Sequence, residues 1–142
     1  MAARSLSKTA PRRQRLICVA DAAESVAVVE QFVATRKDVV LLRAAELDLA
    51  LRLVRRDPAD VMLLDLDATG LATAAIMKIL RANSATHTCA VVALAADTWP
   101  GAAVKALEAG FFLYLVKPLE TGPLTEALDY ALEFAARERA EL

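Results

Sequence analysis

The sequence predicts an α/β fold in which five strands, each followed by a helix, form a doubly wound three-layer sandwich around a parallel sheet. One indication is a series of short apolar runs without two-residue alternation, which is typical of strands buried on both faces of a parallel sheet. The other is the helical spacing of apolar residues between these runs. At 142 residues the chain fits one domain, and it contains no internal repeat. The predicted strands are 16–20, 39–42, 61–66, 90–95 and 112–116.

The first two helices are predicted at 23–35 and 44–55, where apolar side chains recur on one helical face. These side chains are Val26, Val29 and Val33 in the first segment and Leu47, Leu51 and Val54 in the second.

The remaining helices are predicted from spacing and from residues that begin or end a helix. The third covers 72–82, and the fifth runs from about 120 to 139. The fourth starts after Pro100, a residue favoured in a first helical turn, and ends at Gly110, a good helix terminator. The repeating apolar residues are Ile76, Ile79 and Leu80 in the third helix and Leu124, Leu128, Ala131 and Ala135 in the fifth.

Composition and charge exclude several classes of protein. An apolar content of 57% argues against disorder. Charged residues interrupt every apolar run before it reaches the length of a membrane span. With a net charge of −1, the chain gives no reason to expect nucleic acid or an acidic membrane as a partner.

The N-terminal segment 1–14 is predicted to be a flexible basic tail, and 15–142 the folded domain. Residues 1–15 carry five basic side chains and no acid: Arg4, Lys8, Arg12, Arg13 and Arg15. The segment lacks the apolar centre of a secretory signal. Its composition also fits an organellar transit peptide or a basic docking arm.

Cys18 and Cys89 are the only two cysteines, and each lies in or beside an apolar run. Without a CxxC motif or a Cys/His cluster, they are expected to be reduced core thiols of a cytoplasmic protein. His87 stands alone in a polar stretch and is expected on the surface.

Two acids and a lysine stand at the carboxyl ends of three predicted strands. Asp65 lies at the tip of the third strand, Asp21 directly follows the first, and Lys117 follows the fifth. Ligands of open α/β sheets collect at that edge, so these side chains predict one site. The chemistry that such a site suits is phosphoryl transfer assisted by a divalent metal.

Three stretches of the chain, in order and on the predicted elements, match a known family. They are Arg15-Leu16-Ile17-Cys18-Val19-Ala20-Asp21, Val61-Met62-Leu63-Leu64-Asp65-Leu66-Asp67 and Ala109-Gly110-Phe111-Phe112-Leu113-Tyr114-Leu115-Val116-Lys117-Pro118-Leu119. From about Arg15 to Phe134 the chain resembles the receiver (response-regulator) domains of bacterial two-component systems. The resemblance implies a flavodoxin-like (βα)5 fold with strand order 2-1-3-4-5 and a role in phosphorelay signal transduction.

The resemblance also implies roles for individual residues. Asp65 matches the phosphoacceptor, and Asp21 matches the second acid of the pair that helps hold Mg²⁺. Asp67 stands where the family offers a backbone carbonyl to the metal. Lys117 matches the lysine that contacts the phosphoryl group, and Lys117-Pro118 is usually a cis peptide in such domains. Tyr114 matches the aromatic switch residue.

Three positions depart from the family pattern. Ala20 replaces the first acid of the metal-binding pair, so Mg²⁺ binding is expected to be weak. Ala95 replaces the Ser or Thr that ends the fourth strand. Because a methyl group cannot bond a phosphoryl oxygen, we expect an impaired switch. Thr69 stands in place of a usual proline.

The resemblance implies that Asp65 receives its phosphoryl group from a histidine kinase or a phosphotransfer protein. The fourth helix, fifth strand and fifth helix would then form the face for a downstream partner or for a homodimer. Such a domain is not an enzyme, beyond self-phosphorylation from a small phosphodonor.

Two alternatives remain open. One is a pseudo-receiver that binds partners independently of phosphate, with Asp65 and Lys117 serving only as a structural ion pair. The other is a flavodoxin-like protein that binds flavin or another small ligand. It is disfavoured because Asp21-Ala22-Ala23-Glu24 replaces the phosphate loop expected after the first strand.

Overall fold

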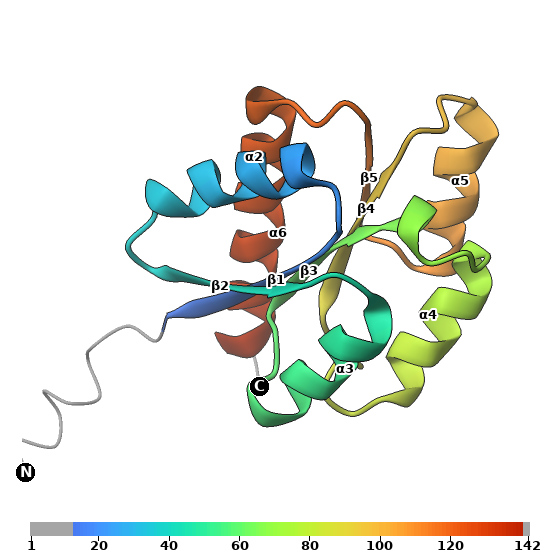
Figure 1. Ribbon diagram of the computed structural model, residues 1–142. Helices are drawn as coiled ribbons and strands as arrows, with labels where there is room; N and C mark the ends of the chain where they lie inside the picture. Colours follow the sequence, from blue (N-terminus) through green and yellow to red (C-terminus); the bar gives the residue numbers. More distant parts are fainter. Residues whose placement is uncertain (1–12, 141–142) are drawn as a thin grey trace, which may run out of the picture.

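A computed structural model describes residues 13–140 and shows strands and helices alternating along the chain (Figure 1). The strands are β1 (Gln14–Val19), β2 (Val39–Ala44), β3 (Val61–Asp65), β4 (Ala90–Ala95) and β5 (Leu113–Val116). The helices are α2 (Ala23–Ala34), α3 (Leu47–Arg56), α4 (Thr73–Ala82), α5 (Pro100–Ala109) and α6 (Thr121–Ala140), with a 3-10 turn η1 (Leu66–Ala68) after β3.

The five strands form one parallel sheet with the order β2-β1-β3-β4-β5, which confirms the predicted topology. The chain builds the sheet outwards from β1, first to β2 on one side and then to β3 on the other. The point where the direction changes therefore lies between β1 and β3. In open α/β sheets this switch point, at the carboxyl ends of the strands, is where ligands bind.

Helices cover both faces of the sheet and produce the predicted three layers (Figure 1). Successive residues of a strand point to opposite faces, so each strand supplies side chains to two separate cores. The α3–α5 core lies under α3, α4 and α5, and its largest fully buried side chains are Ile17, Val19, Met62, Leu64, Ile76 and Leu80. The α2–α6 core lies under α2 and α6, with Leu16, Val29, Leu63, Leu94, Leu124 and Leu128.

Helix α5 begins and ends as its sequence predicts. Pro100 stands in its first turn, and Gly110 follows its last residue with φ 117°. Gly110 N–H donates to Leu107 O at 3.1 Å and Phe111 N–H donates to Ala106 O at 3.0 Å. This is the Schellman arrangement, in which the left-handed residue is usually glycine.

The amino edge of the sheet carries a polar contact that was not predicted. Asp60, just before β3, is buried, and its Oδ2 accepts a hydrogen bond of 2.7 Å from Arg15 N–H of β1. Its carboxylate also pairs with Arg139 near the end of α6. The carboxylate thereby joins β1, β3 and α6 at this edge.

The two cysteines are buried, as predicted. Burial raises the pKa of Cys18 to about 11 and that of Cys89 to about 12, so both remain thiols at neutral pH. No helix within residues 13–140 is long and apolar enough to cross a membrane.

The element boundaries differ from the predictions at a few places. Strand β1 begins at Gln14, which is the last residue of the predicted tail 1–14. Residues 1–12 of that predicted tail lie outside the described residues. Strand β2 continues to Ala44, and α3 begins three residues later than predicted, at Leu47. The 3-10 turn η1 was not predicted.

Candidate functional site

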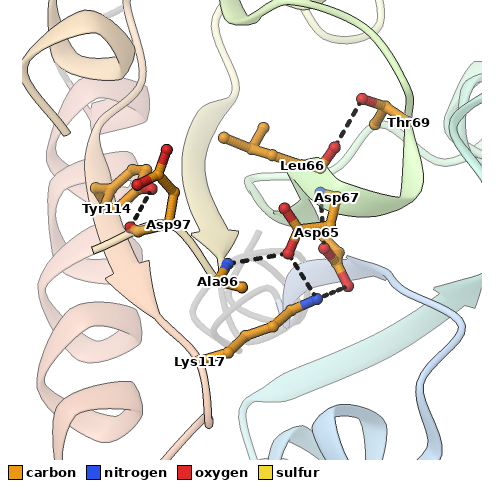
Figure 2. A network of polar contacts seen from close by, with 8 residues as sticks. All are labelled: Asp65, Leu66, Asp67, Thr69, Ala96, Asp97, Tyr114 and Lys117. Carbon is orange, nitrogen blue, oxygen red and sulfur yellow. Dashed lines mark hydrogen bonds and ion pairs between the residues drawn. The ribbon is translucent and has the colours of Figure 1, made fainter. Parts of the chain in front are cut away.

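Asp65 ends β3 at the carboxyl edge of the sheet, and only 2% of the residue is exposed. A carboxylate this deeply buried needs partners that satisfy its charge and its lone pairs. Its Oδ2 lies 2.8 Å from Lys117 Nζ, and its Oδ1 accepts a hydrogen bond of 3.0 Å from Asp67 N–H. Figure 2 shows the side chains of Asp65, Asp67 and Lys117 pointing toward one another.

Lys117 directly follows β5, and its backbone is held by a hydrogen bond to the end of β4. Its N–H donates to Ala95 O at the end of β4 at 2.8 Å, and the Lys117–Pro118 peptide bond is cis, as expected from the resemblance. Its Nζ faces both Asp65 and Asp67 Oδ2, the latter at 3.1 Å. Partial burial lowers the pKa of Lys117, but hydrogen bonds to and charges on the two carboxylates outweigh this effect, and the net pKa is raised.

Asp67 lies in η1, and its side chain crosses to the neighbouring strand. Its Oδ2 accepts a hydrogen bond of 2.9 Å from Ala96 N–H, the first residue after β4, in addition to its contact with Lys117 (Figure 2). Three strand ends, those of β3, β4 and β5, are therefore joined by two carboxylates, one ammonium group and one backbone amide. The sequence prediction assigned Asp67 a backbone carbonyl for the metal and a negative charge near it, but not these contacts with Ala96 and Lys117.

Asp21 follows β1 and is exposed. Within residues 13–140 it has no hydrogen bond or ion pair to Asp65, Asp67 or Lys117. It lines a cavity of about 590 Å³ together with Ala20, Glu30 and Arg43 on the β2 side of the switch point. The predicted site residues thus form a compact group of three, with Asp21 beside it on the adjacent strand end.

The donor set at this edge is suitable for Mg²⁺ in kind, because it consists of oxygens. Asp65 Oδ1 accepts one hydrogen bond and keeps a further lone pair, and the carboxylate of Asp21 is accessible. The described residues contain no group of three His, Cys, Asp or Glu side chains that could hold a metal ion. Mg²⁺ keeps several waters and needs only one or two carboxylates from a protein, a requirement that Asp21 and Asp65 would meet.

The two alanines that depart from the family pattern are both buried. Ala95 ends β4 and lies opposite Val116 in the sheet register. It lines a cavity of about 260 Å³ together with Asp67, Asp97 and Tyr114. Ala95 therefore presents a methyl group, in place of the family's hydroxyl, to a cavity that the predicted switch residue Tyr114 also lines.

Tyr114 of β5 is half-buried, and its hydroxyl donates to Asp97 O at 2.9 Å (Figure 2). Its ring packs against the α3–α5 core. Burial, assisted by the charges of Asp97 and Asp67, raises its pKa. The hydroxyl is therefore a hydrogen-bond donor at neutral pH.

Thr69, the third departure, stabilises the turn that carries Asp67. Its Oγ1 donates to Leu66 O at 3.0 Å and accepts from Leu71 N–H at 3.1 Å. The side chain of Thr69 thus closes the turn after β3 without a proline.

Comparison with known proteins gives one family. A family model described as the response regulator receiver domain matches residues 16–129. No curated protein matches the chain in sequence.

Solved structures show the same fold at low sequence identity. The signal receiver domain of an HD domain-containing protein from Pseudomonas fluorescens Pf-5 has a TM-score of 0.79 and 21% identity, covering 94% of this chain and 97% of that one. The receiver domain of the sensor histidine kinase PA1611 from Pseudomonas aeruginosa PAO1 is described with a magnesium ion in its active-site cleft. It has a TM-score of 0.70 and 23% identity, and the match covers 85% of this chain and 98% of that one. HP1043, an orphan response regulator of H. pylori, has a TM-score of 0.70 and 14% identity, covering 86% and 99%.

Proposed function

The chain belongs to the response regulator receiver domain family, and we propose that it is the phosphoacceptor of a cytoplasmic phosphorelay, receiving a phosphoryl group on Asp65 from a histidine kinase or a phosphotransfer protein. The observation that carries this proposal is the 2.8 Å contact between Asp65 Oδ2 and Lys117 Nζ at the carboxyl edge of the sheet. This contact supports the proposal because a carboxylate that could attack phosphorus and a cation that could neutralise phosphoryl oxygens lie together, beside the switch point where ligands of such sheets bind.

The proposed transfer is an in-line displacement at phosphorus. A carboxylate oxygen of Asp65 forms the new P–O bond while the P–N bond of the donor phosphohistidine breaks, and the imidazole leaves with the electron pair of that bond. Lys117 stabilises the negative charge on the phosphoryl oxygens, because catalysis of this step consists mainly of positioning and electrostatics. Mg²⁺, held by Asp21, Asp65 and the backbone carbonyl of Asp67, would supply further neutralisation of that charge.

The test uses acetyl phosphate with Mg²⁺ and follows intact mass. Wild-type protein should gain one phosphoryl group, and Asp65→Asn should gain none. Because Ala20 removes one acid of the metal pair, the wild-type reaction should require high Mg²⁺ concentrations. A mass increase that persists in Asp65→Asn, or no increase at any Mg²⁺ concentration, would exclude Asp65 as a phosphoacceptor.

The proposed output surface is the face formed by α5, β5 and α6. It presents large exposed apolar side chains: Val104, Leu107, Val116, Tyr130 and Phe134. Phe112 lies beneath the last two, with ring centroids 5.3 Å from Tyr130 and 4.9 Å from Phe134. Apolar groups of this size on a receiver domain support a role in binding a downstream protein or a second copy of the chain.

A second candidate function is a pseudo-receiver that binds its partner regardless of phosphate. It is favoured by Ala95, because its methyl group gives a phosphoryl group no contact that differs between two states of the domain. The same phosphorylated sample decides between the two functions. Partner binding or oligomeric state that is equal before and after phosphorylation supports the pseudo-receiver, whereas a change that Asp65→Asn abolishes supports the phosphorelay.

A further inference from the structure

The carboxylate of Asp67 lies at the mouth of the site and is not held there by burial, since 46% of the side chain is exposed. It is held by two donors, Ala96 N–H at 2.9 Å and Lys117 Nζ at 3.1 Å. These donors come from the end of β4, which is the strand next to β3, and from the end of β5, which lies beyond β4. An anion is therefore already bound next to the proposed phosphoacceptor, and it is part of the chain.

The donors around Asp65 are few, and they are in use. The single hydrogen of Ala96 N–H is given to Asp67, and the single hydrogen of Asp67 N–H is given to Asp65 Oδ1. Lys117 has three hydrogens, of which two face Asp65 Oδ2 and Asp67 Oδ2. Ala95 supplies no hydroxyl. A phosphoryl group joined to Asp65 would thus need the donors that the carboxylate of Asp67 occupies, and it would also be repelled by that negative charge.

The arrangement is built into the local backbone. Asp65 caps the turn η1 by accepting the N–H of Asp67, and Thr69 closes the turn from its other end. The position of the Asp67 backbone is therefore fixed by two side chains, and the carboxylate reaches β4 without ordering a long loop. Preorganisation of this kind increases the effective strength of an interaction that would be weak on an open surface.

We propose that the carboxylate of Asp67 is an internal competitor of the phosphoryl group, which holds Ala96 N–H and Lys117 Nζ until it is displaced. The proposal rests on the proposed function, because it names how the same site is regulated. The transfer must displace Asp67 from these donors, so Asp67 slows phosphorylation of Asp65. Removal of this carboxylate should accelerate the reaction on the order of tenfold, the factor expected for one charge-assisted hydrogen bond.

The first experiment requires no phosphoryl transfer. In the Asp65→Asn protein, inorganic phosphate is titrated while the amide signal of Ala96 is followed by NMR. The same titration is made with Asp67→Ala added and, as a control, with Asp97→Ala added. Asp97 lies on the same edge and carries the same charge, but its carboxylate accepts only Trp99 N–H, at 2.8 Å, among the contacts of the described residues.

The expected result is phosphate binding about tenfold tighter with Asp67→Ala and unchanged with Asp97→Ala. Equal affinity in all three proteins would overturn the proposal. Absence of binding to the Asp67→Ala protein would overturn it as well, because the freed donors would then form no anion site.

The second experiment measures phosphorylation by acetyl phosphate and Mg²⁺ in the presence of an intact Asp65. The P–O bond of the donor breaks, acetate leaves, and intact mass gives the rate. Asp67→Ala should react about tenfold faster than the wild type, and Asp97→Ala at the wild-type rate. A phosphorylation rate of the Asp67→Ala protein at or below that of the wild type would contradict the proposal that Asp67 competes with the phosphoryl group. If no variant accepts a phosphoryl group, the proposed function fails, and the phosphate titration alone decides the role of Asp67.

Discussion

Lys117 supplies the positive charge that faces the buried carboxylate of Asp65, so its removal should cost stability as well as function. The predicted effect of Lys117→Met is a loss of about 2 kcal/mol in the free energy of unfolding, since a buried charged group loses its partner. Urea unfolding at neutral pH measures this difference. A matched control is Lys105→Met on α5, for which no ion pair is found among residues 13–140 and which should change stability by less than about 0.5 kcal/mol.

The same pair predicts a pH dependence with a definite sign. The pKa of Lys117 in the folded protein lies above its ordinary value of 10.5. The stabilisation is therefore complete below that value and is lost as the pH rises through the higher pKa of the folded state. The stability difference between the wild type and Lys117→Met should shrink above pH 10.5. A difference that stays constant in this range would show that Lys117 acts through packing of its aliphatic chain.

Sequence reasoning at the scale of the residue succeeded for groups fixed by strand ends. Asp65 and Lys117 were expected at one edge because parallel strands bring their carboxyl ends together, and they form an ion pair there. The Asp67 side chain could not be placed, because its contact with Ala96 depends on the turn η1 and not on a spacing in the sequence. The pairing of Asp60 with Arg139 was missed for a similar reason: nothing local connects residues so far apart.

At the scale of the element, the end of α5 offers a test of backbone conformation. Gly110 has φ 117°, and a Cβ at this position would lie 3.2 Å from Met77 Cγ. Gly110→Ala should therefore reduce the free energy of unfolding by about 1–2 kcal/mol, the cost of a left-handed conformation for a residue with a side chain.

Gly122 in α6 is the matched control, since an added Cβ there would meet nothing within 4 Å and φ is not positive. Gly122→Ala should raise stability by about 0.5 kcal/mol, because alanine loses less backbone entropy in a helix. Thermal unfolding of both variants gives the comparison. A Gly110→Ala protein as stable as the wild type would mean that the helix end can adopt another cap.

The boundaries that the sequence predicted well are those with a local cause. Pro100 and Gly110 mark the ends of α5 through their own backbone preferences. The boundary between β2 and α3 was misplaced because Ala44 suits either element. Its carbonyl accepts Ala20 N–H at 3.0 Å, a contact with the neighbouring strand that extends β2. The spacing of apolar residues within one segment cannot predict such pairing between neighbouring strands.

At the scale of the whole molecule, the sheet divides the interior into two cores that should contribute independently to stability. Leu80 of α4 and Leu128 of α6 are fully buried on opposite faces. Each Leu→Ala substitution should cost about 2–5 kcal/mol through lost transfer energy and a residual cavity. Because the sheet separates the two sites, the double variant should lose the sum of the single effects within about 0.5 kcal/mol.

Chemical denaturation of the two single variants and the double variant provides the measurement. If the double variant loses clearly less unfolding free energy than the two single variants together, the two cores relax together across the sheet. The doubly wound three-layer architecture was predictable, because five apolar runs alternating with helical segments admit few arrangements that keep right-handed crossovers. The strand order was expected from the family resemblance.

The contact of Arg139 with Asp60 brings the last turn of α6 to the amino edge of the sheet, where β1 also begins. Strand β1 starts at the amino edge of the sheet, and α6 returns to that edge, where Gln14 Nε2 donates to Leu132 O at 2.8 Å. Asp65 lies at the opposite edge. An affinity surface or a fluorophore attached at residue 13 or residue 140 would therefore leave the carboxyl edge of the sheet, with the proposed phosphoacceptor Asp65, accessible. The kinetics of partner binding, measured with the protein immobilised by either end, should be the same for both ends and the same as for the free protein.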